Sequence, residues 1–199
     1  AGVIGGTTTY MDMPNNKPPI VTNEGLDKKF QVAKNRSFAN YSFYLGTTND
    51  NIEEIKKTSK RACGVKIFMG ASTGNMLVDN IKSLENIFLH CPKLIATHCE
   101  SSPIIDKNFE AAKEKYGDDI PLELHTEIRS RECCIESSTL AINLARNYGS
   151  RLHVLHLTTK EEVDFFSKSA DVAGKSITAE VCIHHMLYSK KDYARKKGF

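Results

Sequence analysis

Short runs of apolar or β-branched residues alternate with helical patterns along almost all of the 199 residues, and this alternation limits the possible folds more than any other feature. The apolar runs are predicted strands. They cover residues 7–13, 41–46, 64–69, 94–99, 151–157 and 176–182. Most of them are apolar on both faces, which is typical of parallel strands covered by helices. The sequence therefore predicts an α/β fold with a parallel sheet.

The segments between these runs have the apolar spacing of amphipathic helices. Predicted helices cover residues 22–34, 51–59, 79–90, 103–116, 129–148 and 159–169, and a basic helix covers 189–197. A (β/α)8 barrel has eight strands and about 250 residues, so six strands fit an incomplete TIM-barrel-like fold or a complete doubly wound sheet. No Pro-, Gly- or Ser-rich linker divides the chain. Residues 1–199 are therefore expected to form a single, partial barrel domain.

Composition and charge argue against several kinds of partner. The chain has 27 Lys and Arg against 24 Asp and Glu, a net charge of +3, which is too balanced to indicate a nucleic acid or a membrane surface. No apolar stretch approaches the roughly 18 residues of a membrane span. The six cysteines contain no Cys-x-x-Cys pair. This pattern favours free, buried thiols in a reducing cytoplasm over a disulfide framework.

Lys66 stands inside the apolar run 64–69, where a charged ammonium group is costly to bury. One interpretation is that its side chain reaches the surface or pairs with an acid. The other is that burial lowers its pKa, so that the neutral amine adds carbon dioxide and becomes a carbamate. A carbamate is an anionic oxygen donor that can bridge two cations, which makes Lys66 a candidate metal ligand.

Histidines gather near the carboxyl ends of predicted strands, where the active sites of parallel α/β folds lie. His98 lies at the end of one run, and His153 and His156 share another. Alternation along a strand would place His153 and His156 on opposite faces, so we expect only His156 to face the interior. Each histidine taken alone is equally consistent with a hydrogen-bonded core residue. His184 and His185 follow a third run, and we expect them at the polar rim of a site rather than on a metal.

Several motifs occur together and in a familiar order. The stretch GGTTTYMDMPNNKPP resembles the GG-T-T…MPN…P segment of cyclic amidohydrolases, and GVKIFMGAS resembles the segment that holds their carboxylated lysine. The motif THCE is similar to their third-histidine motif, and HVLHLTT to their fourth. The stretches AEVCIHHML and ELHTEIRSRECCIESSTLAINLAR resemble dihydroorotases in particular. The chain therefore resembles the dihydroorotase family along nearly its whole length.

This resemblance implies a zinc-dependent hydrolase with two zinc ions in each complete site. Lys66 matches the lysine whose carbamate bridges the two ions, and His98 and His156 match the two histidines that bind the second zinc. Asn15, in the MPN segment, matches the asparagine that holds the substrate carboxylate. The implied reaction is the reversible conversion of dihydroorotate and N-carbamoyl-aspartate, a small-molecule step of pyrimidine biosynthesis.

Two parts of the family's site do not occur in this sequence. There is no His-x-His metal pair with the arginine that often follows it, and no Asp-His-Ala-Pro-like motif with the catalytic aspartate. We expect these parts before Ala1 and after Phe199, in a longer polypeptide of which this chain supplies about strands two to seven. The general acid/base is then expected outside these 199 residues.

Two alternatives stay open. A hydantoinase or allantoinase would use the same metal chemistry on a different ring, although Asn15 and the pair His184–His185 favour a dihydroorotase. A homologue that keeps the barrel could instead be a non-catalytic scaffold, although the presence of Lys66, His98 and His156 argues against it. Because relatives are often dimers, a homodimer is one expected assembly.

Overall fold

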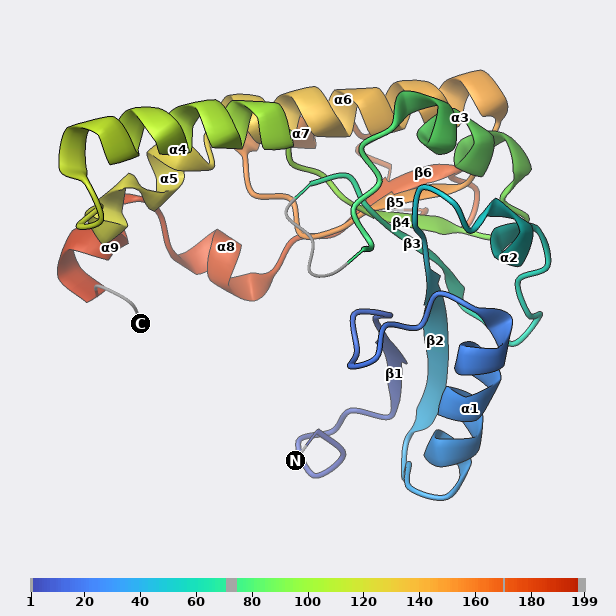
Figure 1. Ribbon diagram of the computed structural model, residues 1–199. Helices are drawn as coiled ribbons and strands as arrows, with labels where there is room; N and C mark the ends of the chain where they lie inside the picture. Colours follow the sequence, from blue (N-terminus) through green and yellow to red (C-terminus); the bar gives the residue numbers. More distant parts are fainter. Residues whose placement is uncertain (1, 71–74, 170, 197–199) are drawn as a thin grey trace.

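A computed structural model describes residues 2–70, 75–169 and 171–196 of the chain. Six strands form one parallel sheet in the order of the sequence. They are β1 (Thr9–Asp12), β2 (Asn40–Gly46), β3 (Gly64–Phe68), β4 (Ile95–His98), β5 (Leu152–Val154) and β6 (Ile177–Ala179). The sheet curls into a half-barrel (Figure 1). The predicted incomplete TIM-barrel-like α/β fold is confirmed. Five of the predicted strands contain an observed one, and β2 begins one residue before its predicted range 41–46.

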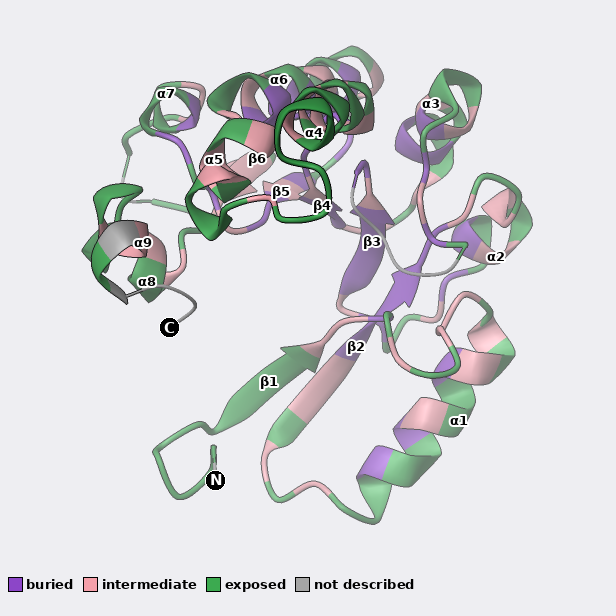
Figure 2. Ribbon diagram, turned by 60° about the vertical axis from the view of Figure 1, so that its left-hand side comes forward, coloured by how far each residue is buried: buried purple, intermediate pink, exposed green. Residues whose placement is uncertain are grey.

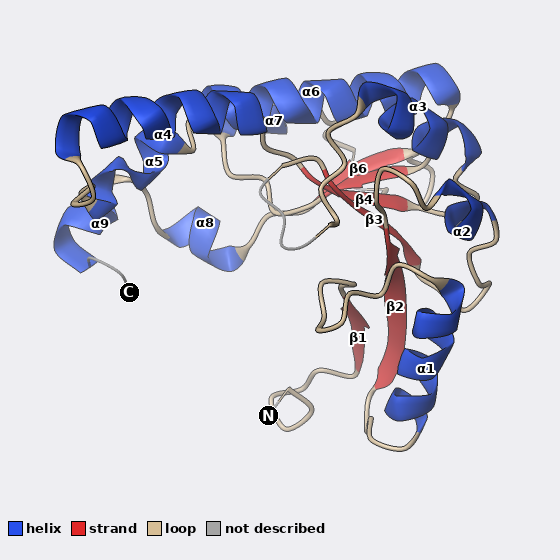
Figure 3. Ribbon diagram, viewed as in Figure 1, coloured by secondary structure: helices blue, strands red, loops and turns tan. Residues whose placement is uncertain are grey.

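Helices connect the strands and lie mainly on the outer side of the curled sheet (Figures 2 and 3). They are α1 (Asn23–Lys34), α2 (Ile52–Lys56), α3 (Ile81–His90), α4 (Ser102–Tyr116), η1 (Leu122–Leu124), α5 (His125–Ile128), α6 (Arg131–Tyr148), α7 (Lys160–Val163), α8 (Ile183–Leu187) and α9 (Lys191–Lys196). The sequence pattern did not predict η1, α5 and α8. Each is only three to five residues long, which is too short for a helical repeat to be visible.

The predicted helix 159–169 is shorter than expected. It begins as the sequence indicates, with Thr159 and Glu162 forming a capping box. It ends at Val163, and beyond it the hydroxyls of Ser167 and Ser169 accept hydrogen bonds from backbone N–H groups two residues later. Such local serine turns compete with the helix for the same backbone groups. At the other predicted end, residue 197 of the helix 189–197 lies outside the described residues.

The main hydrophobic core lies between the outer face of the sheet and the helices. Along each strand, residues of this core alternate with residues that face the inside of the half-barrel. Val65 and Ile67 of β3, for example, belong to the core and are fully buried. Phe88 of α3 is also buried there, at 1% exposure. The residues from helices that contribute to this cluster include Leu26, Phe30, Ile55, Leu84, Ile87, Ile142 and Leu144. Burial of this apolar surface supplies the main driving force that holds the curled sheet in place.

The inner face of the sheet has a different chemistry. Strand register places Lys66 beside Ala96, Ala96 beside His153, and His153 beside Thr178. Residues in register on parallel strands share a face, so this row crosses the inner face of the half-barrel. A small second apolar cluster that includes Ala96 and Leu155 lies on the same face. The polar side chains of this row, Lys66, His153 and Thr178, therefore lie beside a few apolar side chains, close to the carboxyl ends of the strands.

A close backbone approach fixes the position of the chain after β4. A Cβ atom added at Gly70 would lie 2.0 Å from the carbonyl oxygen of Glu100. Side chains other than hydrogen cannot be placed there without displacing one of the two segments. The backbone N–H of Met69 also donates to the carbonyl of His98, at 3.0 Å. The ends of β3 and β4 therefore hold each other in register at the edge where the histidines lie.

Candidate metal centre

Two histidines meet at the carboxyl edge of the sheet. His98 is the last residue of β4, and His156 lies two residues beyond the end of β5. The Nδ1 atom of His98 and the Nε2 atom of His156 are 3.2 Å apart. These two nitrogens come from neighbouring strands and face one another, as two ligands of one metal ion must.

The backbone conformation of His156 explains this approach. Its φ angle is +39°, in the left-handed region, which residues other than glycine seldom adopt. The neighbours on each side stay tied to other strands, because Leu155 donates to the carbonyl of Thr97 and Leu157 donates to the carbonyl of Glu180. His156 is thus held in a turn between two anchored residues. Strained backbone of this kind is often found at functional sites.

His153 corrects one expectation about this strand. Its register with Ala96 places it on the same inner face as Lys66, whereas strand alternation predicted that only His156 would face inward. The prediction was wrong because β5 ends at Val154, so alternation does not extend to His156. Both ring nitrogens of His153 have partners, Thr178 at 2.8 Å and Glu180 at 3.3 Å. His153 is therefore held as a structural residue of the inner face.

Glu100 and Arg129 orient the ring of His98. The carboxylate of Glu100 lies 2.8 Å from His98 Nε2, and it accepts two hydrogen bonds from the Arg129 guanidinium, at 2.9 and 2.6 Å. Burial alone would raise the pKa of Glu100, but the hydrogen bonds from His98 and Arg129 outweigh it and hold that pKa below its usual value. An ionised carboxylate can only accept hydrogen bonds, so the His98 nitrogen that faces it, Nε2, carries the proton. The other ring nitrogen, Nδ1, then has a free lone pair.

These two orienting residues were not identified from the sequence. Glu100 lies in the THCE motif and Arg129 in the stretch TEIRSRE, but 29 positions separate them. No local spacing rule joins residues so far apart. The one available signal was the charge of two residues near a predicted strand end and a predicted helix start.

The pair of histidines fits a zinc ion. Zinc binds imidazole nitrogen at about 2.0–2.1 Å, so two such nitrogens at tetrahedral positions lie roughly 3.3 Å apart. The observed separation is 3.2 Å. Burial, followed by the electrostatic influence of the neighbouring His98 ring, lowers the pKa of His156. A neutral imidazole is the form that binds metal, so the local environment favours the ligating form.

Lys66 lies on the inner face, one strand away from His98, and is only 2% exposed. Its Nζ atom donates to the carbonyl of Ile67 at 2.9 Å and stands 4.1 Å from the centre of the Phe68 ring. Burial lowers the pKa of Lys66 to about 7. None of the ion pairs among the described residues includes it. The interpretation of Lys66 as a surface or acid-paired lysine is therefore wrong.

Phe68 connects this lysine to the histidines. Its ring lies beside Lys66 Nζ, and its centre is 6.3 Å from the centre of the His98 ring. Phe68 and His98 are also in register on β3 and β4. The three candidate ligands Lys66, His98 and His156 thus occupy one region of the inner face, with direct side-chain contact between the two histidines.

Asn15 lies in the loop that follows β1 and is exposed. Its neighbour Asn16 is held in place, since the amide oxygen of Asn16 accepts from Lys29 at 2.7 Å and Lys29 pairs with Asp12 at 2.7 Å. Within the described part of the chain, the Asn15 amide makes no hydrogen bond. A fixed loop with one unengaged amide can offer hydrogen bonds to a ligand.

All six cysteines are free thiols. Three of them, Cys99, Cys133 and Cys134, are buried, and the other three are partly exposed. The prediction of free rather than disulfide-bonded cysteines is therefore met, while burial applies to only half of them. In the described residues, no helix is both long enough and apolar enough to cross a membrane.

Comparisons with known proteins find relatives that match almost the whole of this chain. No protein-family model matches the chain. An allantoinase of Bacillus velezensis is 30% identical over 96% of this chain and 43% of its own length. A dihydroorotase of Methanosarcina acetivorans is 27% identical over 100% of this chain and 44% of its own length. Among solved structures, an L-hydantoinase from Arthrobacter aurescens matches with a TM-score of 0.86 and 26% identity, over 96% of this chain and 43% of that one. The chain thus spans less than half the length of these relatives.

Proposed function

We infer that this chain, which is homologous over its whole length to dihydroorotases, allantoinases and hydantoinases, supplies part of the active site of a zinc-dependent cyclic amidohydrolase. The proposed reaction is the reversible hydrolysis of dihydroorotate to N-carbamoyl-aspartate in pyrimidine biosynthesis. The observation that carries the proposal is the 3.2 Å approach of His98 Nδ1 to His156 Nε2 at the carboxyl edge of the sheet.

Each candidate residue has a distinct proposed role. His98 and His156 would hold one ion, while Glu100 keeps the His98 proton on Nε2 and Arg129 holds Glu100. Zinc bound there would lower the pKa of water and polarise the amide carbonyl. In hydrolysis the ring C–N bond breaks, a C–O bond to the water oxygen forms, and the leaving nitrogen takes a proton. The proposed proton donor is the aspartate that the family resemblance places outside this chain.

Lys66 is proposed to carry the bridging group between two zinc ions. Its amine would attack carbon dioxide, forming an N–C bond and releasing one proton, which gives the anionic carbamate. A lysine with a pKa of about 7 has a large neutral fraction at physiological pH, whereas an ordinary lysine has almost none. Burial at 2% exposure supplies that neutral amine. The carbamate charge would then be compensated by the two cations.

Asn15 is proposed to bind the substrate carboxylate. An amide can donate to a carboxylate without adding a charge, and this amide is exposed after β1. A ring with a carboxylate, such as dihydroorotate, would use this contact. The contact therefore favours dihydroorotase over activity on an uncharged ring.

A hydantoinase or allantoinase activity is the second candidate. It is supported by the 30% identity to an allantoinase and by the TM-score of 0.86 with an L-hydantoinase. These substrates present a different ring to the same metal chemistry. Dihydroorotate, allantoin and hydantoin should therefore be assayed side by side with the zinc-loaded, full-length protein.

The test of the proposal combines this assay with two matched pairs of variants. His156→Asn should reduce hydrolysis at least a hundredfold, whereas His90→Asn, at the exposed end of α3, should not change it. Asn15→Ala should abolish orotate binding, with Asn143→Ala on the exposed face of α6 as its control. Hydrolysis of allantoin or hydantoin alone would replace the dihydroorotase assignment. No hydrolysis of any of the three rings would refute the proposed enzyme activity.

Zinc content separates an enzyme from a non-catalytic scaffold. The proposed site holds two zinc ions when complete, so at least two per chain are expected in the full-length protein, and a scaffold would hold none at these residues. Free thiols throughout the described chain support a reducing, cytoplasmic location. A homodimer is proposed as the assembly, and sedimentation of the full-length protein tests it.

A further inference from the structure

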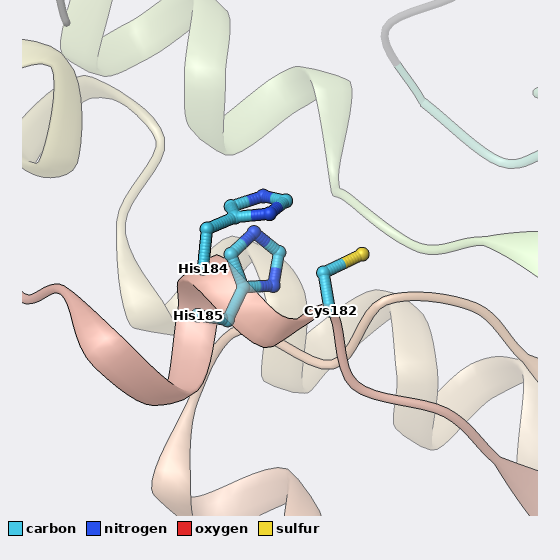
Figure 4. Close-up of side chains that lie close together, drawn as sticks. All are labelled: Cys182, His184 and His185. Atoms are coloured by element: carbon cyan, nitrogen blue, oxygen red, sulfur yellow. The ribbon is translucent and has the colours of Figure 1, made fainter. Parts of the chain in front are cut away.

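We propose that Cys182, His184 and His185 form an additional metal site for zinc or a similar transition-metal ion, separate from the His98–His156 pair. The potential ligand atoms of these three residues all lie within 4.8 Å of one another. Cys182 directly precedes α8, and the two histidines lie in its first turn. Figure 4 shows the His184 ring lying over the edge of the His185 ring, with Cys182 beside them.

The local fold holds these side chains together. The backbone N–H of His185 donates to the carbonyl of Cys182 at 3.0 Å, which closes the turn between them. The rings of His184 and His185 are in edge contact, with centres 4.3 Å apart and planes at 73°. Thiolate and imidazole ligands around one zinc lie roughly 3.3–3.6 Å apart. The three ligand atoms lie within 4.8 Å of one another, so an ion bound between them would draw the side chains closer to this spacing.

His185 has the second hydrogen bond that ligating histidines usually have. Its Nδ1 atom lies 3.2 Å from the carbonyl oxygen of Leu157. A carbonyl can only accept, so Nδ1 carries the proton and Nε2 keeps its lone pair. Metal-binding histidines almost always donate their other ring N–H to a carbonyl or carboxylate, which fixes the tautomer and the ring orientation. His185 is therefore prepared to ligate through Nε2.

The type of donor indicates which metal is favoured. A thiolate and two imidazoles suit zinc, cobalt or copper, whereas magnesium and calcium favour oxygen donors. Three protein ligands leave a fourth tetrahedral position for water or another donor. His184 is exposed, and Cys182 and His185 are partly exposed. An ion from solvent can therefore reach the site.

A second group with the same spacing lacks this chemistry. Glu100 also lies within 4.8 Å of the thiols of Cys133 and Cys134. Both oxygens of Glu100 already accept hydrogen bonds from Arg129, so this carboxylate has a cation partner. By contrast, no ion pair among the described residues involves His184 or His185.

The additional site is linked to the end of β5. Leu157, whose carbonyl accepts from His185, directly follows His156. A metal that fixes the His185 ring would therefore fix one side of the turn that presents His156. We expect the role of this ion to be structural, tying the start of α8 to the loop after β5.

Cobalt substitution tests this site independently of the proposed enzyme activity. The candidate ligands Lys66, His98 and His156 include no sulfur, so a thiolate-to-cobalt charge-transfer band in the near ultraviolet would come from a cysteine outside that set, and the proposal assigns it to Cys182. The full-length protein, stripped of metal and titrated with Co²⁺, should develop this band. Cys182→Ser should remove it. Cys63→Ser, at a similarly half-buried thiol of the chain, should leave it unchanged.

Cys99→Ser is the decisive second control, because Cys99 directly follows His98. A band that survives in Cys182→Ser and disappears in Cys99→Ser would move the thiolate to the His98 region and overturn the proposal. Failure to form any band in the wild-type protein would overturn it as well. Zinc analysis adds a second readout, in which His185→Asn should lower the affinity for one zinc per chain at least tenfold. Circular dichroism checks that each variant folds.

Discussion

The carboxylate of Glu100 is the residue through which the arrangement of the candidate metal centre can be tested most sharply. One of its oxygens accepts from Arg129 Nε at 2.9 Å, and the other accepts from both Arg129 Nη2, at 2.6 Å, and His98 Nε2, at 2.8 Å. The substitution Glu100→Gln keeps the size of the side chain. It replaces one acceptor oxygen with an NH2 donor, which must then face an N–H of Arg129 or His98.

The expected loss of stability and of zinc affinity in Glu100→Gln follows from these three contacts. At least one charge-assisted hydrogen bond is lost, and such bonds contribute about 1.5–3 kcal/mol. The Arg129 side chain is 32% exposed, so water compensates in part, and we expect unfolding to become easier by about 2 kcal/mol. The His98 tautomer is no longer fixed, so the affinity of this histidine pair for zinc should fall about 10- to 100-fold.

The assay is urea unfolding of the metal-free, full-length protein together with zinc titration against a chromophoric chelator. Glu161→Gln is the matched control, because Glu161 forms an ion pair with Arg131 in which both side chains are about half exposed. Exposed pairs of this kind contribute little to stability, so this variant should behave as the wild type. An unchanged zinc affinity in Glu100→Gln would refute the argument that Glu100 orients His98.

Three further predictions concern the surrounding fold. Gly70→Ala should destabilise the protein and weaken zinc binding, because the new Cβ would lie 2.0 Å from the Glu100 carbonyl, whereas Gly174→Ala, where the closest atom is 3.9 Å away, should have little effect in the same urea and zinc titrations. Thr159→Ala removes the capping box of α7 and should lower the free energy of unfolding by about 1 kcal/mol, measured by urea unfolding. Burial raises the pKa of the Cys91 thiol to about 11. The stability that the folded state gains from this protonated thiol is therefore fully present below the pKa of an unfolded thiol, near 8.5, and is lost as pH rises toward 11. The stability of Cys91→Ala should therefore fall less steeply than that of the wild type between pH 8.5 and 11, and parallel curves would contradict this assignment.

The strands could be predicted from the sequence because each is a compact apolar run with helical segments on both sides. The same pattern left two interpretations of Lys66 open, and the structure supports the one in which its side chain is buried, at 2% exposure. The position of His98 at a strand end was also visible. These features depend on local sequence, where period and composition carry the information.

Features that depend on distant contacts could not be predicted in this way. The left-handed conformation of His156 results from the anchoring of Leu155 and Leu157 to other strands. The Glu100–Arg129 ion pair joins a strand end to the turn before α6, across 29 positions. In both cases the residues meet only once the chain has folded, so no periodic pattern in the sequence predicts them.

The most direct test of the central claim is a crystal structure of the full-length, zinc-loaded protein with anomalous diffraction data at the zinc edge. We predict an anomalous peak about 2.1 Å from both His98 Nδ1 and His156 Nε2, in the position where these nitrogens now face each other at 3.2 Å. Zinc located elsewhere, with these two nitrogens still hydrogen-bonded to each other, would contradict the assignment of the metal centre.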